Sequence, residues 1–142
     1  MHGKSYEEIK IGDTASFEKT ISESDVYLFA GITGDLNPAH VNEPKASATR
    51  FGGRIAHGML VSSFISTVLG MYLPGPGTIY LGQELKFLAP VKLGDTVKAI
   101  VEVVAMDPEK KRITLKTQCF IQDGTLVVDG QAMVLAPKKI VL

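Results

Sequence analysis

The stretch from Gly58 to Leu73, GMLVSSFISTVLGMYL, constrains the fold more than any other part of the chain, because it is strongly apolar and has no charged residue. Its large apolar side chains lie round much of a helical circumference, at Met59, Phe64, Ile65, Val68 and Leu69. A helix with this pattern is buried on most sides. It is shorter than the roughly 20 apolar residues that span a bilayer, and PGPG at 74–77 ends it. The stretch therefore predicts a helix at the centre of a core.

Four segments after this helix have the two-residue period or the short β-branched runs of strands. They are TIYLGQELKFLAP (78–90), GDTVKAIVEVVAMD (94–107), KRITLKTQCFIQD (111–123) and TLVVDGQAMVLAP (125–137). The links MDPEK and QDG are typical of hairpin connections. A further strand, DTASFEKTI at 13–21, precedes the helices. The sequence thus predicts five strands, four of them consecutive.

A short amphipathic helix is expected at residues 23–31, between the first strand and the apolar helix. Ser22 is a suitable N-cap, and Asp25 places an acidic group in the first turn. The apolar positions Val26, Phe29 and Ala30 have the i, i+3, i+4 spacing of one helix face. Gly31 and Gly34 are expected to end this helix.

The order of the elements is strand, helix, loop, buried helix and four strands, which favours the α+β class. A single long antiparallel sheet wrapped round the central apolar helix accounts for this order. A chain of 142 residues suits one domain, so we expect a single domain over residues 1–142. Because such a sheet covers the helix on one side only, the uncovered helix face and the sheet edges predict a homodimer.

Charge and cysteine content exclude several classes of protein. The chain has 15 basic and 15 acidic residues, so neither nucleic acid nor a charged membrane surface is an expected partner. The single cysteine, Cys119, permits no internal disulfide, and we expect a buried residue rather than a reactive thiol. The N-terminal MHGKSYEEIKIGD lacks the apolar core of a signal peptide. These features indicate a cytoplasmic protein without a membrane segment.

The motif GDLNPAH, from Gly34 to His40, combines a carboxylate and an imidazole within a long polar segment. Pro38 disfavours a helical conformation for Asn37 and presets its own φ for a helix. We therefore expect Asn37 to be an N-cap, Pro38 the first helical residue and His40 the third. The motif is either a polar turn, which composition alone favours, or an acid–base pair formed by Asp35 and His40.

A second cluster, RIAHGML from Arg54 to Leu60, begins the apolar helix. Gly58 lies at or beside the helix N-terminus, where free N–H groups suit a carbonyl oxygen that develops negative charge. The alternative is a glycine needed only for tight packing. His57 is expected to be a structural hydrogen-bonding residue rather than a catalyst. Asp35, His40 and His57 are the only plausible metal ligands, and their spacing matches no compact site, so no metal is expected.

The chain resembles the MaoC-like (R)-specific enoyl-CoA hydratases, the hydratase 2 family. The central match is FAGITGDLNPAHVNEPKA from Phe29 to Ala46, supported by RIAHGML and by IYLGQELKFLAPVKLGDTV from Ile79 to Val97. Together the matches cover about residues 8–137. Ala39 departs from the family pattern, which usually has a larger aliphatic residue there. The resemblance implies a hot dog fold, in which an antiparallel sheet wraps round a central helix, and at least a dimer.

The resemblance also implies a reaction and roles for individual residues. Asp35 and His40 match the catalytic pair that holds and deprotonates a water. Gly58 matches the main-chain N–H donor to the thioester oxygen. The substrates would be trans-2-enoyl-CoA and, in the reverse direction, (R)-3-hydroxyacyl-CoA. No cofactor is implied, because coenzyme A is part of the substrate.

Four further residues are expected to contact the substrate. Ser66 matches a family hydroxyl on the central helix near the catalytic pair. Ser62, Ser66 and Leu69 have i, i+4, i+7 spacing, so one helix face is expected to line the site, with Leu69 in the wall of the acyl pocket. Asn37, in the motif itself, completes this set.

Two other functions remain open from the sequence. A hot dog acyl-CoA thioesterase would release the free thiol of coenzyme A, and a non-catalytic acyl-CoA-binding module would bind the thioester without turnover. The acyl carrier is also open between coenzyme A and acyl carrier protein. Four basic residues are candidate phosphate contacts, or alternatively solvated surface charges: Lys45, Arg50, Arg54 and Lys86.

Overall fold

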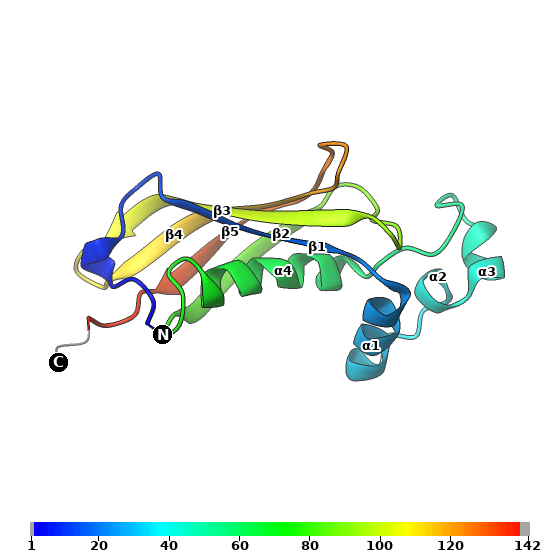
Figure 1. Cartoon of the computed structure of the whole chain (residues 1–142), viewed down its shortest axis with the longest axis horizontal. Helices are drawn as coiled ribbons and strands as arrows, with labels where there is room; N and C mark the ends of the chain where they lie inside the picture. Colours follow the sequence, from blue (N-terminus) through cyan, green and yellow to red (C-terminus); the bar gives the residue numbers. More distant parts are fainter. Residues whose placement is uncertain (1, 140–142) are drawn as a thin grey trace.

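A five-stranded antiparallel sheet curves over one long helix in the computed structural model, which describes residues 2–139 (Figure 1). The sheet has the strand order β1-β3-β4-β5-β2. The elements are η1 (Tyr6–Glu8), β1 (Thr14–Thr20), α1 (Glu23–Thr33), α2 (Pro38–Val41), α3 (Glu43–Ser47), α4 (Gly58–Met71), β2 (Ile79–Phe87), β3 (Thr96–Asp107), β4 (Arg112–Phe120) and β5 (Leu126–Leu135). The predicted architecture is confirmed. The prediction of a single domain over 1–142 includes residues 1 and 140–142, which lie outside the described part.

The consecutive strands β3, β4 and β5 pair as the short links predict. β3 pairs with β4 through Lys98 to Asp107, and β4 pairs with β5, both antiparallel. β1 and β2 complete the two edges by pairing with β3 and β5. Inward positions alternate with outward ones along β3 and β4, so one face of the sheet is apolar and turns toward α4.

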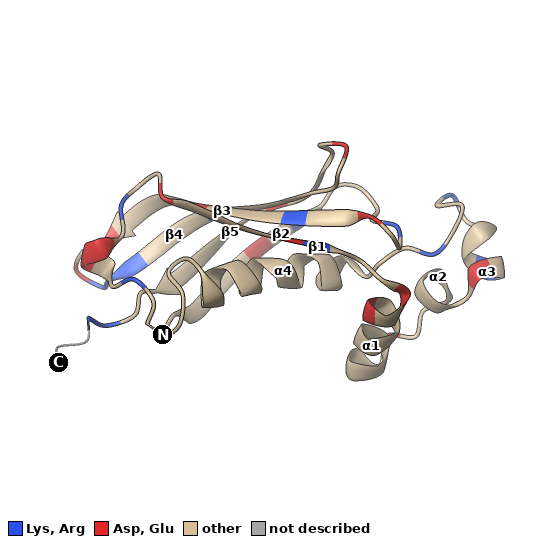
Figure 2. Ribbon diagram, viewed as in Figure 1, with Lys and Arg blue, Asp and Glu red and all other residues tan. Residues whose placement is uncertain are grey.

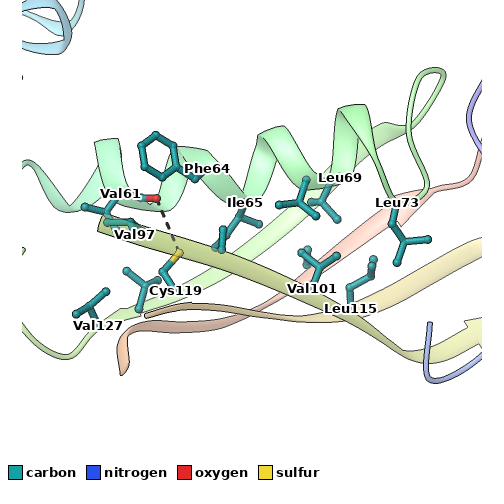
Figure 3. Packing of buried hydrophobic residues seen from close by; sticks show 14 of the residues in the cluster. Val61, Phe64, Ile65, Leu69, Leu73, Val97, Val101, Leu115, Cys119 and Val127 are labelled. Atoms are coloured by element: carbon teal, nitrogen blue, oxygen red, sulfur yellow. Dashed lines mark hydrogen bonds between the residues drawn. The ribbon is translucent and has the colours of Figure 1, made fainter. Parts of the chain in front are cut away.

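The core lies between the inner face of the sheet and α4. Figure 3 shows Val61, Ile65 and Leu69 of the helix packed against side chains of the sheet, among them Val101 and Cys119. α4 carries no charged residue along its length, as its uniform tan colour in Figure 2 shows. Within residues 2–139, no helix is long and apolar enough to cross a membrane.

Cys119 is fully buried in β4, as expected, and its thiol faces the Val61 carbonyl oxygen at 3.8 Å. Burial raises the pKa of this thiol to about 12, because the thiolate would lose its hydration. It therefore stays protonated at neutral pH and contributes to packing, not to nucleophilic chemistry.

Met59 departs from the pattern predicted for α4. This residue is 57% exposed, whereas Phe64, Ile65, Val68 and Leu69 are buried. The difference arises because the sheet covers one side of the helix, and Met59 lies on the other side near the helix start. The predicted burial of the helix on most sides therefore does not extend to Met59.

Helices α1, α2 and α3 lie beyond one end of the sheet, beside the start of α4 and far from both termini (Figure 1). We call this segment, residues 23–47, the overhang. Ser22 caps α1 as predicted, in a capping box with Asp25. The helix continues through Gly31 and ends at Gly34, whose φ of 82° gives a left-handed C-cap. The expected end at Gly31 was therefore wrong, because Gly31 lies within the helix, whereas the role expected of Gly34 is confirmed.

Candidate active site

The GDLNPAH motif forms a tight turn that leads into α2. Asn37 is the N-cap, and its side chain accepts a hydrogen bond from the Ala39 N–H at 3.0 Å, with Pro38 in the first helical turn. Asp35 Oδ1 accepts a hydrogen bond from the Asn37 N–H at 3.2 Å. Both predicted features, the cap and the turn, are confirmed. One carboxylate oxygen of Asp35 is thus used to build the turn, and the carboxylate as a whole is exposed.

The His40 ring is held against the segment that precedes α4. Its Nδ1 lies 2.7 Å from the Ile55 carbonyl oxygen, and the Ile55 N–H donates to the Ala39 carbonyl at 3.1 Å. Because a carbonyl oxygen only accepts, Nδ1 carries the proton in this contact. In the neutral ring, the lone pair is therefore on Nε2. His40 presents an acceptor that is able to hold a water or take a proton.

His57 lies directly against this pair, which sequence spacing did not indicate. Its Nε2–H donates to the main-chain carbonyl of Asp35 at 3.0 Å. Its ring stacks on that of His40 with centroids 3.7 Å apart and planes at 26°. Phe29 of α1 covers it at 4.8 Å. The expectation of a structural hydrogen bond is confirmed, but its partner is the main chain of the motif.

Asp35, His40 and His57 each bring one donor or acceptor atom to within 4.8 Å of the others. Two hydrogen bonds of about 2.8 Å each span about 5.6 Å, so one water is able to bridge the Asp35 carboxylate and the His40 ring. The argument from spacing that these three residues are dispersed was wrong. That no metal binds here stays a prediction.

Gly58 is the first residue of α4, as predicted, with His57 as its N-cap. Among the described residues, its N–H has no hydrogen-bond acceptor, as is usual for the first turn of a helix. Glycine permits a close approach here, since an added Cβ would lie 2.8 Å from two ring carbons of Phe87. The Gly58 N–H, at the positive end of the α4 dipole, is therefore free beside the Phe87 ring.

A pocket of about 420 Å³ adjoins Gly58 and is mainly apolar. Its lining residues are Arg50, Phe51, Ile55, Ala56, Gly58, Met59, Val61, Phe87, Leu88, Ala89, Pro90, Val91, Val127 and Val128. The Arg50 guanidinium lies 5.0 Å from the centroid of the Phe51 ring. Of the four basic residues considered for phosphate contacts, Arg50 is the one that lines this pocket. The sequence did not predict Phe51 and Phe87 as pocket residues, because tertiary contacts between distant parts of the chain bring them to the start of α4.

Residues 8–122 match the family described as the MaoC like domain. The chain belongs to this family. It is 57% identical over 134 residues to the (R)-specific enoyl-CoA hydratase of Rhodospirillum rubrum, covering 94% of this chain and 92% of the relative. It is 48% identical to the 3-hydroxybutyryl-CoA dehydratase of Methylorubrum extorquens, covering 94% and 85%.

A solved structure of a MaoC-like relative has the same fold. The unliganded R-hydratase from Pseudomonas aeruginosa superposes with a TM-score of 0.93 and is 45% identical, covering 99% of this chain and 92% of that chain. The expected hot dog fold is therefore confirmed. The GDLNPAH turn lies within the matched residues 8–122, so the family match agrees with the resemblance found in the motif.

The three helix residues predicted to line the MaoC-like site do not share one environment. Ser62 is buried, and its hydroxyl donates to the Met59 carbonyl at 3.1 Å. Ser66 is exposed on the face of α4 that the sheet leaves open. Leu69 is buried in the core. None of the three lines the pocket beside Gly58, so their substrate contacts stay predictions, as does that of Asn37.

Arg54 ties the overhang to the start of α4. Its guanidinium forms ion pairs with Glu23 at 3.1 Å and Glu43 at 2.7 Å, and donates to the Tyr27 hydroxyl at 2.6 Å. Hydrogen bonding to Arg54 lowers the pKa of Glu23 and Glu43 below the ordinary value for glutamate. A phosphate would have to displace these carboxylates, so Arg54 is a structural cation in this arrangement.

Proposed function

We propose that this protein is an (R)-specific enoyl-CoA hydratase, which adds water reversibly to trans-2-enoyl-CoA and dehydrates (R)-3-hydroxyacyl-CoA in the reverse direction. The observation that carries the proposal is that Asp35 and His40 meet at His57, the N-cap of α4, while the next residue, Gly58, lines an apolar pocket. The names of the relatives from R. rubrum and M. extorquens support the same reaction class and an enoyl-CoA substrate.

Asp35 and His40 hold a water because both accept hydrogen bonds from it. Asp35 has a carboxylate oxygen beyond the one that accepts from the Asn37 N–H, and His40 offers the lone pair of Nε2. A water that donates both hydrogens to these two acceptors turns an oxygen lone pair outward. Asp35 takes one proton as this oxygen attacks C3 of the enoyl group, and His40 orients the water and shares the proton transfer. Such general base catalysis accelerates a reaction about 10²–10⁴-fold.

The thioester oxygen becomes negatively charged when water adds to C3. We assign its stabilisation to the Gly58 N–H, because this donor is unpaired among the described residues and lies at the positive end of α4. One donor of this kind is worth roughly 3–4 kcal/mol in the transition state. C2 then takes a proton from the acid–base pair, which returns the site to its starting state. All atoms of one water enter the product.

The pocket beside Gly58 suits the thioester and its carrier. Its apolar wall accepts the aliphatic part of the substrate, and Arg50 with Phe51 offers a cation and an aromatic face at the same opening. We infer that coenzyme A is the carrier and that no further cofactor takes part. A CoA thioester substrate, with Cys119 as a free buried thiol, supports a cytoplasmic location.

We also propose that the working unit is a homodimer. Large apolar side chains are exposed on the edge strand β2, including Ile79, Tyr80 and Leu81, and on the overhang at Leu28 and Ile32. An unpaired, apolar edge strand is normally covered by a partner. Ser66, on the open face of α4, would then lie close to a second copy.

The test is to mix the protein with crotonyl-CoA and follow the loss of absorbance of the conjugated enoyl thioester. Asp35→Asn is expected to lower kcat by about 10²–10⁴-fold, because the amide is a very weak base. The amide oxygen still accepts from the Asn37 N–H, so the turn and the thermal midpoint are expected to stay intact. Near-normal turnover in this variant would exclude Asp35 as the base.

Two product assays separate the proposed reaction from its alternatives. A thiol reagent detects free coenzyme A only if the protein is a thioesterase, and chiral separation of the 3-hydroxyacyl product establishes the hand of the addition. Binding of crotonyl-CoA without either product would identify a non-catalytic acyl-CoA-binding module.

A further inference from the structure

The His57 side chain contacts every element that carries the acid–base chemistry. Its Nε2–H donates to the main-chain oxygen of Asp35, and its ring face lies on the ring of His40. Its own main-chain carbonyl accepts from the Leu60 and Val61 N–H groups, which starts α4 next to Gly58. One residue therefore joins the turn, α2 and the helix start.

The protonation pattern of His57 is fixed by its surroundings. Since the Asp35 carbonyl only accepts, Nε2 carries the proton, and in the neutral ring Nδ1 is left with its lone pair. Nδ1 is buried, and the described residues offer it no hydrogen-bond partner. The residue as a whole is 3% exposed. A buried acceptor without a partner costs free energy.

This unsatisfied atom shows why packing alone does not account for histidine at position 57. A phenylalanine would fill the same space between Phe29 and His40 without burying a lone pair. A glutamine would reach the Asp35 carbonyl with an N–H but would lack the flat ring. Of side chains this size, histidine combines a face for His40 with a donor for Asp35, and the cost at Nδ1 accompanies that combination.

We propose that His57 is a positioning residue of the active site, which sets the spacing of Asp35 and His40 through its Nε2–H tautomer. The inference rests on the proposed hydratase function. The Nε2–H···O bond fixes the main chain that carries the base, and the stacked ring fixes the plane in which His40 Nε2 lies. Thioester binding depends on the separate pocket and the Gly58 N–H. Loss of His57 therefore reduces the rate of the chemical step and leaves affinity for the thioester unchanged.

Three variants separate the donor from the ring. H57F keeps the ring and removes the donor, H57Q places an amide N–H at the distance of Nε2, and H57N places it one bond short. H2F, at the exposed His2 near the N-terminus, is the matched control. The measurements are kcat with crotonyl-CoA, the dissociation constant of the unreactive butyryl-CoA, and the thermal midpoint of each variant.

We expect H57F and H57N to lower kcat roughly 10- to 100-fold, because a misplacement of about 1 Å at a reacting group costs up to about 10²-fold in rate. H57Q is expected to recover part of this loss, because it restores the donor to Asp35 without the stacked ring. H2F is expected to match the wild type, and butyryl-CoA to bind all variants equally. Wild-type kcat in H57F would overturn the proposal. So would equal losses in the three variants accompanied by weaker butyryl-CoA binding, because that pattern indicates a packing role alone.

A spectroscopic measurement tests the role of His57 independently of the proposed hydratase function. Nitrogen NMR of histidine-labelled protein reports which ring nitrogen carries the proton, and we expect Nε2 for His57. A proton on Nδ1 would overturn the positioning role whatever the enzyme's activity. Absence of turnover in the wild type with Nε2 protonated would instead refute the proposed hydratase function and leave the contact to Asp35 established.

Discussion

Gly58→Ala tests the geometry of the helix start more sharply than any other single substitution. The new Cβ would lie 2.8 Å from the Cδ1 and Cε1 atoms of Phe87 and 3.4 Å from its Cγ. Carbon atoms pack at about 3.5–4.0 Å, so the ring has to move by a large fraction of an ångström. The φ of Gly58 lies outside the left-handed region, and alanine therefore meets no backbone strain. The steric cost therefore depends on how far the ring is able to move.

The expected magnitude comes from two opposing effects. Gly to Ala at a compatible helical position stabilises by about 0.4–1 kcal/mol, because the unfolded chain has less freedom to lose. Overpacking against a ring costs about 1–3 kcal/mol. Phe87 is 53% exposed on an edge strand and is able to shift outward, which favours the lower part of that range. We expect the two effects together to lower the free energy of unfolding of Gly58→Ala by about 0.5 kcal/mol.

The same substitution is expected to change sign when the ring is removed. In a Phe87→Ala background the overlap is absent, and Gly58→Ala should then stabilise by about 0.4–1 kcal/mol. Urea unfolding of the four proteins at one protein concentration gives the coupling energy directly. Additive effects, with Gly58→Ala destabilising in both backgrounds, would refute the contact between Phe87 and the helix start. Alanine keeps the main-chain N–H, so all four proteins retain the proposed donor to the thioester oxygen.

Two further predictions concern the overhang and the assembly. The lowered pKa of Glu23 and Glu43 means that their ion pairs with Arg54 stabilise the fold above the ordinary glutamate pKa of 4.5, and that this contribution is lost as pH falls through the lower folded values. The difference in urea midpoint between wild type and Arg54→Met is therefore expected to be largest near neutral pH and to narrow in acid; a constant gap would contradict this. Light scattering is expected to give twice the chain mass of 15.3 kDa, and a monomer at micromolar concentration would rule out the homodimer.

The local features of the overhang were predictable because they depend on neighbouring residues. Ser22 and Asn37 cap their helices through contacts within three residues, so their roles follow from the sequence. The end of α1 was misplaced by two residues, at Gly31 instead of Thr33, because Gly31 and Gly34 are equally good candidates until the backbone is known. Only Gly34 has the left-handed φ that ends a helix.

The contacts across the candidate site were not predictable in the same way. His57 and Asp35 are 22 positions apart, and Phe87 and Gly58 are 29 apart, so no periodicity relates them. The motif resemblance pointed to Asp35, His40 and Gly58 as a set. It did not indicate that the His57 ring contacts Asp35 and His40, since these contacts depend on how the overhang packs against the start of α4.

The two halves of the candidate site come from different parts of the chain, and this separation bears on how such a protein changes over time. Asp35 and His40 lie on the overhang, whereas most of the pocket wall comes from the start of α4, β5 and the segment at 87–91. Substitutions in that wall are free to reshape what is bound while the groups that activate water keep their places. The architecture thus lets substrate preference diversify while the reaction stays the same. Residues 87–91 are the place to alter which acyl substrates the enzyme accepts, because changes there leave Asp35 and His40 in position.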